Sequence, residues 1–174
     1  MKAWIQKHSI GLTRVSVIAV MGMIFLFSSQ TGSQSGAMSS GITAWFLGVV
    51  VPDFGNLSAE EQETWLAGVG FFVRKMAHFS EYALLGFSLI LHIRQLQKKI
   101  RVHLPWLWAW SIGMLYAASD EFHQGFVAGR GPSVWDVMID SAGVIAGVGV
   151  LLLIALYAKK RKTACRIPEK IELL

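Results

Sequence analysis

The sequence predicts an all-α membrane protein whose core is a bundle of four transmembrane helices. Apolar residues make up 53% of the 174-residue chain and charged residues only 16%, whereas soluble domains average about 25% charged residues. The mean hydropathy is +0.49. Most apolar residues fall in four runs that approach the ~20 residues needed to cross a bilayer. These runs cover residues 12–27, 76–93, 104–119 and 135–158.

The length of the chain predicts one domain rather than two, because a chain of this size fits a single compact bundle. Residues 1–174 are therefore expected to form one transmembrane domain that ends in a basic tail over residues 159–174. The first and third runs are shorter than a full span, so we expect them to extend into flanking residues. The single cysteine, Cys165, excludes an internal disulfide.

The basic residues lie mainly on one side of the predicted four-span arrangement. They lie before or at the start of the first run, between the second run and the third, and after the fourth; only Arg74, Lys75 and Arg130 fall on the other side. Because Lys and Arg accumulate in cytoplasmic loops, both termini are expected in the cytoplasm and residues 28–72 outside. The tail, KKRKTACR, is expected beside anionic lipid. Nucleic-acid binding is not indicated, because the sequence has no basic face with stacking aromatic residues.

The first apolar run has an alternative interpretation as a cleavable signal peptide. Basic residues, an apolar segment and then the small polar residues SSQTGSQSGA match the pattern of such a leader. Cleavage would leave the topology of the remaining spans unchanged.

The outer segment between the first and second runs predicts an amphipathic loop and helix. Ser58 and Glu61 form a capping box, which predicts that a helix begins there and continues towards Gly68 and Gly70, where the second span takes over. Residues 42–51, ITAWFLGVVV, are too short to span a bilayer and are expected to lie in its interface.

Ionisable and polar side chains gather at the outer end of the predicted bundle. Because every member of the set falls at the same depth, we expect three helices to direct these groups into one outward-facing polar pocket under the turn 122–134. The set comprises Arg74, Lys75, His78, Glu81 and Tyr82 on the second span, Asp120, Glu121 and Gln124 at the end of the third, Arg130 in the turn, and Asp136 and Asp140 on the fourth.

Residue spacing predicts some of the packing around this set. Gln124 lies four residues after Asp120 and shares its helix face, provided that the helix continues that far. Asp140 continues into a stripe with Gly143 and Gly147, a spacing of small residues that lets a neighbouring helix approach closely.

Three segments together resemble the VanZ-like family of small bacterial membrane proteins. They are FSSQTGSQS after the first run, RKMAHFSEYALLG, and SDEFHQGFVAGRGPSVWDVMIDSAGVIAG. The similarity covers about residues 15–155, the core of the expected domain, and lies in the order and spacing of the polar residues. It implies a protein of the bacterial cell membrane and, for some members, resistance to teicoplanin-type lipoglycopeptides. It implies no established chemical reaction.

Three interpretations of the polar set remain open. In the first, the charges form a structural ion-pair network. In the second, they bind a lipid-linked or glycopeptide-related envelope ligand through its phosphate or carboxylate, for which arginine is well suited. The candidate ligand-binding residues are Arg74, Lys75, Tyr82, Gln124, Arg130, Asp136 and Asp140.

The third interpretation is an intramembrane enzyme that acts on a lipid-linked envelope substrate. Its candidate catalytic residues are His78, Glu81, Asp120 and Glu121, with His78 as the acid or base. Alternatively, Glu121, Asp136 and Asp140 together with a histidine could hold a divalent metal such as Mg²⁺ or Mn²⁺. No other cofactor is indicated, and familiar motifs such as HExxH or a phosphate-binding loop do not occur.

Overall fold

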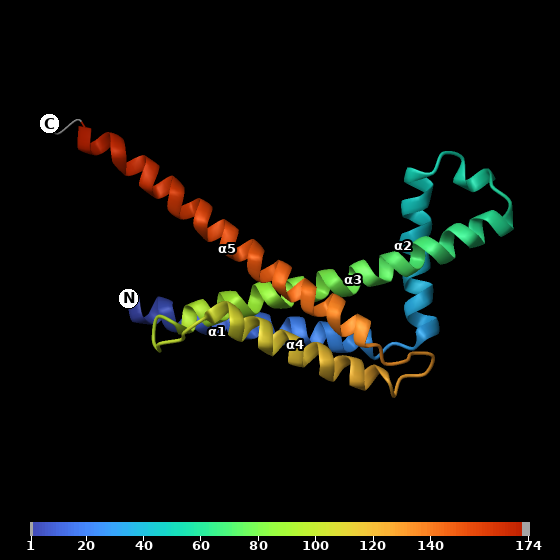
Figure 1. Ribbon diagram of the computed structural model, residues 1–174, viewed down its shortest axis with the longest axis horizontal. Coiled ribbons are helices and arrows are strands. Elements are labelled where there is room, and N and C mark those ends of the chain that lie inside the picture. The colour runs from blue at the N-terminus through green and yellow to red at the C-terminus, as the bar shows by residue number, and fades with distance from the viewer. Residues whose placement is uncertain (1, 172–174) are drawn as a thin grey trace.

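The computed structural model describes the backbone of residues 2–171 and the side chains of residues 8–161 and of Thr163, and within this part it consists of helices joined by turns and loops, with no strand. Figure 1 shows α1, α3, α4 and α5 running alongside one another for part of their length, while α2 crosses α3 at one end. The helices are α1 (Lys2–Ser28), α2 (Gly32–Val50), α3 (Ala59–Leu96), α4 (Pro105–Gln124) and α5 (Val134–Ile171), with a single 3₁₀ turn, η1 (Phe54–Asn56), before α3.

Within the described residues, three helical segments are long and apolar enough to cross a membrane: His8–Ser28 in α1, Ala59–Leu96, which is α3, and Val134–Arg161 in α5. These helices correspond to the first, second and fourth predicted spans. The third predicted span corresponds to α4. This helix has 20 residues, but it is not one of the three helical segments that are apolar enough to cross a membrane. Its C-terminal turn is polar and includes Asp120 and Glu121, which lowers its hydropathy. The fourth span therefore remains a prediction.

The capped helix and the second span are one continuous helix, α3. Its first turn confirms the predicted capping box: the Ser58 hydroxyl accepts a hydrogen bond from Glu61 N, and the Glu61 carboxylate accepts one from Ser58 N. Near Gly68 and Gly70, where the second span was predicted to take over, α3 continues without interruption. A glycine costs only about 1 kcal/mol in a helix, so α3 continues through both positions.

The predicted interfacial segment over residues 42–51 is the second half of α2, a helix that begins ten residues earlier. The sequence analysis missed its start because the residues before Ile42 are small and polar. Thr31 caps α2: its hydroxyl accepts a hydrogen bond from Gln34 N, while the Gln34 side chain accepts one from Thr31 N. Ser39, Thr43 and Leu47 form the buried face of α2, and α2 packs against α3.

The start of α1 and the C-terminal part of α5 lie on the same side of the bundle (Figure 1). The loop between α3 and α4 is on the side of the termini, whereas the turn between α4 and α5 is at the other end near α2. The predicted basic tail continues α5 as helix to Ile171, and α5 diverges from the other helices as it approaches the C-terminus. Residues 172–174 of that tail lie outside the described residues.

Glycines bring α3 and α5 into close contact, as the spacing of Gly143 and Gly147 predicts. A Cβ atom on Gly147 would overlap the carbonyl oxygen of Ala83, and one on Gly143 would overlap that of Phe79. Gly86 on α3 presses in the same way against the backbone of Val144. The buried core continues from this contact to α1 and α4 through apolar side chains that include Ile24, Leu85, Ile90 and Ala117.

Candidate functional site

The predicted polar residues do lie at one end of the bundle, but they divide between a cavity and a buried network. The cavity has a volume of about 200 Å³ and lies between the end of α1, α2, α3 and the α4–α5 turn. Of the predicted site residues, Arg74, His78, Glu81 and Arg130 line it. The remaining predicted residues lie between helices or at the base of the α4–α5 turn.

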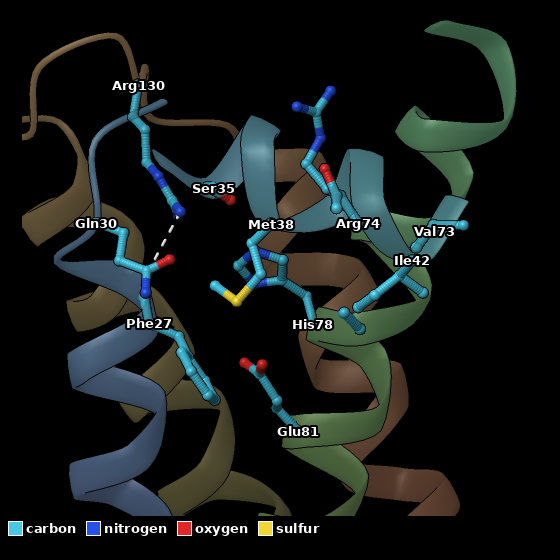
Figure 2. A pocket seen from close by; sticks show the side chains of 12 residues that line it. Phe27, Gln30, Ser35, Met38, Ile42, Val73, Arg74, His78, Glu81 and Arg130 are labelled. Carbon is cyan, nitrogen blue, oxygen red and sulfur yellow. Dashed lines mark hydrogen bonds between the residues drawn. The ribbon is translucent and has the colours of Figure 1, made fainter. Parts of the chain in front are cut away.

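The walls of the cavity are mainly apolar, and its polar groups are concentrated at the mouth and the floor. Figure 2 shows Arg130 and Arg74 on opposite sides of the mouth, with Glu81 extending upward from the floor and the His78 ring above it. The apolar walls come from three elements: Phe27 on α1, Met38 and Ile42 on α2, and Val73 and Ala77 on α3.

The two arginines differ in how they are held. Arg130 donates to the Gln124 side chain at 2.9 Å and to the Phe27 carbonyl at 3.4 Å. Among the described residues, Arg74 makes no hydrogen bond or ion pair, and its guanidinium passes over Gly36 of α2. Burial lowers the pKa of the Arg130 guanidinium, while the carboxylates of Asp120 and Glu121 act to raise it. Arg74 also lowers the pKa of Arg130, so the two cations repel each other across the mouth.

A hydrogen-bonded relay runs from Arg130 into the bundle. Gln124 accepts from Arg130 through its side-chain oxygen and donates to Asp120 Oδ2 at 3.0 Å. Ser28 at the end of α1 donates to the same carboxylate oxygen at 2.6 Å. Gln124 therefore shares the face of Asp120, as its spacing predicts, and the relay ties α1 to α4 and to the α4–α5 turn. Asp120 is 4% exposed and does not line the cavity.

Glu121, Lys75 and Asp136 fix the start of α5. The buried Glu121 carboxylate accepts a hydrogen bond from Ser133 N at 2.6 Å, at the residue just before α5 begins. Lys75 on α3 forms an ion pair with Asp136 in the first turn of α5, and its ammonium also lies 5.2 Å from the centre of the Phe71 ring. These contacts join α3 and α4 to the start of α5. None of the three residues lines the cavity.

Tyr82 and Asp140 lie deeper in the bundle. Tyr82 is fully buried and Asp140 is 1% exposed. The Tyr82 hydroxyl and Asp140 Oδ1 have no hydrogen-bond partner among the described residues, and Asp120 Oδ1 shares this property. Buried polar atoms without a partner are rare in native proteins, so each one requires a physical explanation.

No group of three or more His, Cys, Asp or Glu residues within the described part of the chain has the arrangement of a metal centre. The carboxylates proposed for a divalent metal are dispersed: Glu121 holds a backbone amide, Asp136 holds Lys75, and Asp140 is buried. The cavity combines two guanidinium groups, one histidine and one carboxylate. This composition favours recognition of an anion over binding of a metal.

Several residues at the site were missed in the sequence analysis. Ser35, Met38 and Ser39 line the cavity from α2, and Phe27 contributes both its ring and its carbonyl. The only sequence signal for α2 was the Thr31–Gln34 capping box, which places a helix start directly after α1. Tertiary packing, which is not visible in the sequence, decides that this helix covers one side of the cavity.

Comparison with known proteins identifies one family. The VanZ/LLP1 family model matches residues 14–155, a range that includes all the predicted site residues. The chain therefore belongs to this family. No curated protein and no solved structure matches it.

Proposed function

We propose that this member of the VanZ/LLP1 family binds an anionic, lipid-like molecule of the bacterial cell envelope in the cavity between α1, α2 and α3. The bound ligand would change how teicoplanin-type lipoglycopeptides bind at the cell surface, and so lower the susceptibility of the bacterium to them. One observation carries the proposal: an apolar-walled cavity has two guanidinium groups at its mouth and no ion pair to either among the described residues.

The chemistry of the cavity supports a lipid-like ligand with an anionic head. A guanidinium binds a phosphate or carboxylate through two parallel N–H···O bonds, and Arg74 has all its side-chain donors available within the described structure. Below the mouth, Phe27, Met38 and Ile42 offer apolar surface for a hydrocarbon segment. A head group that bridges both arginines would also remove their mutual repulsion.

The proposed topology places the cavity on the outer side of the membrane. The chain would cross the bacterial cell membrane four times with both termini in the cytoplasm, because most basic residues lie at the end of the bundle that carries the termini. The cavity lies at the opposite end, near the α4–α5 turn. The bilayer and an envelope ligand would then be the partners of the protein.

Susceptibility assays in a teicoplanin-sensitive Gram-positive host test the proposal. The host would express the wild type, Arg74→Ala or Arg74→Lys, with Arg94→Ala at the opposite end of α3 as the matched control. We expect Arg74→Ala to lose protection at unchanged membrane abundance, Arg74→Lys to retain part of it, and Arg94→Ala to behave as wild type. Full protection by Arg74→Ala would contradict the proposal.

A second candidate function is an intramembrane enzyme, and one observation favours it. His78 and Glu81 both line the cavity from α3 and lie one helical turn apart. A histidine and a carboxylate at the floor could move a proton on a bound head group. Under this alternative, Glu81→Gln would abolish protection while a lipid-like ligand still bound. Under simple binding, protection would fall only as far as ligand affinity falls.

A further inference from the structure

The cavity is lined by two further polar side chains besides the arginines at its mouth. They are Gln30, between α1 and α2, and Ser35 in the first turn of α2, and both are half-buried. Within the described structure only their backbone amides are engaged, with the carbonyl oxygens of Phe27 and Thr31 respectively. The Gln30 amide group and the Ser35 hydroxyl are therefore available to donate hydrogen bonds to a bound molecule.

These side chains and the two arginines surround the mouth from different sides. Figure 2 shows Gln30 and Arg130 on one side, Arg74 on the other, and Ser35 between them. All four groups can donate hydrogen bonds, and two of them are positively charged. Glu81, the one carboxylate that lines the cavity in the described structure, lies at the floor. The mouth therefore suits a ligand with several acceptor oxygens and more than one negative charge.

The number of acceptor oxygens separates the candidate head groups. A carboxylate has two oxygens in one plane, which a single guanidinium satisfies through two parallel N–H···O bonds. A phosphodiester also has two free oxygens, and it carries one negative charge. A phosphomonoester has three terminal oxygens that point in different directions, and its charge at pH 7 is about −1.5 to −2. Of these head groups, the phosphomonoester best matches donors on several sides of the mouth and two guanidinium charges.

The size of the cavity also favours a compact head group. Its volume of about 200 Å³ is below the roughly 300–1,000 Å³ of sites for drug-sized ligands. A terminal phosphate at the mouth leaves the apolar walls formed by Phe27, Met38 and Ile42 to a hydrocarbon segment. A sugar on the head group would occupy that space instead.

We propose that the head group of the ligand is a phosphomonoester, so that the ligand is a lipid with a terminal phosphate. This inference rests on the proposed function, because it concerns the same cavity. Arg74 and Arg130 neutralise the two charges of the phosphate from opposite sides. Gln30 and Ser35 donate to the remaining oxygen, and they thereby distinguish the ligand from a phosphodiester, in which that oxygen is esterified.

Native mass spectrometry of the purified full chain in detergent tests the head group. Three lipids with the same acyl chains are compared: phosphatidic acid, which is a phosphomonoester, its methyl diester phosphatidylmethanol, and zwitterionic phosphatidylcholine. We expect phosphatidic acid to bind about tenfold more tightly than phosphatidylmethanol, which lacks one charge and one free oxygen. Equal binding of these two, with both above phosphatidylcholine, overturns this inference and leaves the proposed function intact. Equal binding of all three lipids contradicts both.

Substitutions at Gln30 and Ser35 test the assigned donors. Because neither side chain is hydrogen-bonded within the described structure, Gln30→Ala and Ser35→Ala should keep the Tm of the wild type. We expect each to lower the affinity for phosphatidic acid by about tenfold. Gln30→Glu should abolish the preference over phosphatidylmethanol, because an added carboxylate repels a dianion more strongly than a monoanion.

Ser40→Ala is the matched control, since the exposed Ser40 hydroxyl donates to the Gly36 carbonyl oxygen and does not line the cavity. We expect it to bind all three lipids as the wild type does. Wild-type affinity and preference in the Gln30 and Ser35 variants would overturn the assignment of these two residues.

Glycerol 3-phosphate distinguishes a lipid from a soluble phosphomonoester, because it presents the same phosphate without acyl chains. We expect it not to displace phosphatidic acid at equimolar concentration, since it offers no hydrocarbon to Phe27, Met38 and Ile42. Displacement at that concentration would show that the cavity takes a soluble phosphomonoester, and it would overturn the assignment to a lipid.

Discussion

Ser28 at the last turn of α1 donates a 2.6 Å hydrogen bond to Asp120 Oδ2 on α4. Both side chains are buried, and Gln124 donates to the same oxygen. This single contact joins the end of the first helix to the polar network and, through Gln124, to Arg130 at the mouth of the cavity. The end of α1 is therefore in contact with the polar network.

Removal of the Ser28 hydroxyl should destabilise the protein, because Asp120 then loses one of its two side-chain donors. We expect Ser28→Ala to lower the free energy of unfolding by about 1–3 kcal/mol, measured by thermal unfolding in detergent. Ser29→Ala is the matched control, since the exposed Ser29 hydroxyl donates its hydrogen bond to the Phe25 carbonyl of its own helix. Equal stability of the two variants would contradict the relay.

A methyl group at Gly147 should separate α3 from α5. The new Cβ would overlap the Ala83 carbonyl oxygen, an atom of the α3 backbone that cannot rotate away. We expect Gly147→Ala to cost about 1–3 kcal/mol, as overpacked cores do, with reduced membrane abundance. Gly149→Ala is the control, because its Cβ would meet no atom within 4 Å. A stable Gly147→Ala protein would show that the helices are less closely packed.

The ion pair between Lys75 and Asp136 should show strong coupling in a double-mutant cycle. Both side chains are about one quarter exposed, at 27% and 25%, so we expect Asp136→Asn alone to cost only about 1–2 kcal/mol. Replacement of both residues by apolar ones, Lys75→Met with Asp136→Leu, should recover most of the loss, because no charge is left unpaired. Additive losses in thermal unfolding would mean that the two residues act independently.

Substitutions of the two arginines should differ in their effects on thermal stability and on ligand binding. Arg130 holds Gln124 and the Phe27 carbonyl, so we expect Arg130→Ala to lower both the Tm and teicoplanin protection. Arg74 has no such bonds within the described structure, so Arg74→Ala should keep the Tm of the wild type. A comparable loss of Tm in both variants would indicate that Arg74 also supports the fold.

Local patterns in the sequence predicted the features that depend on residue spacing alone. The capping box at Ser58, the shared face of Asp120 and Gln124, and the close approach at Gly143 and Gly147 are all confirmed. Each of these features is set within one helix, by hydrogen bonds over three or four residues or by the absence of a side chain on one face.

Features that depend on the rotation of one helix against another could not be predicted in this way. Arg74 and Lys75 are adjacent in sequence, yet Arg74 lines the cavity and Lys75 pairs with α5. Consecutive residues on a helix point about 100° apart, so neighbouring helices determine which of them reaches a cavity. The division between the cavity and the buried network follows from the same cause.

Direct binding of an anionic lipid is the most decisive test of the proposed function. Native mass spectrometry of the purified chain would compare phosphatidic acid with phosphatidylcholine for the wild type, Arg74→Ala and Met38→Trp, which fills the cavity. We predict a preference for phosphatidic acid that falls roughly 10-fold or more in Arg74→Ala, the loss expected for a charge-assisted hydrogen bond, and that disappears in Met38→Trp. Equal binding of the two lipids, or an unchanged preference in both variants, would contradict the assignment of the cavity as an anionic ligand site.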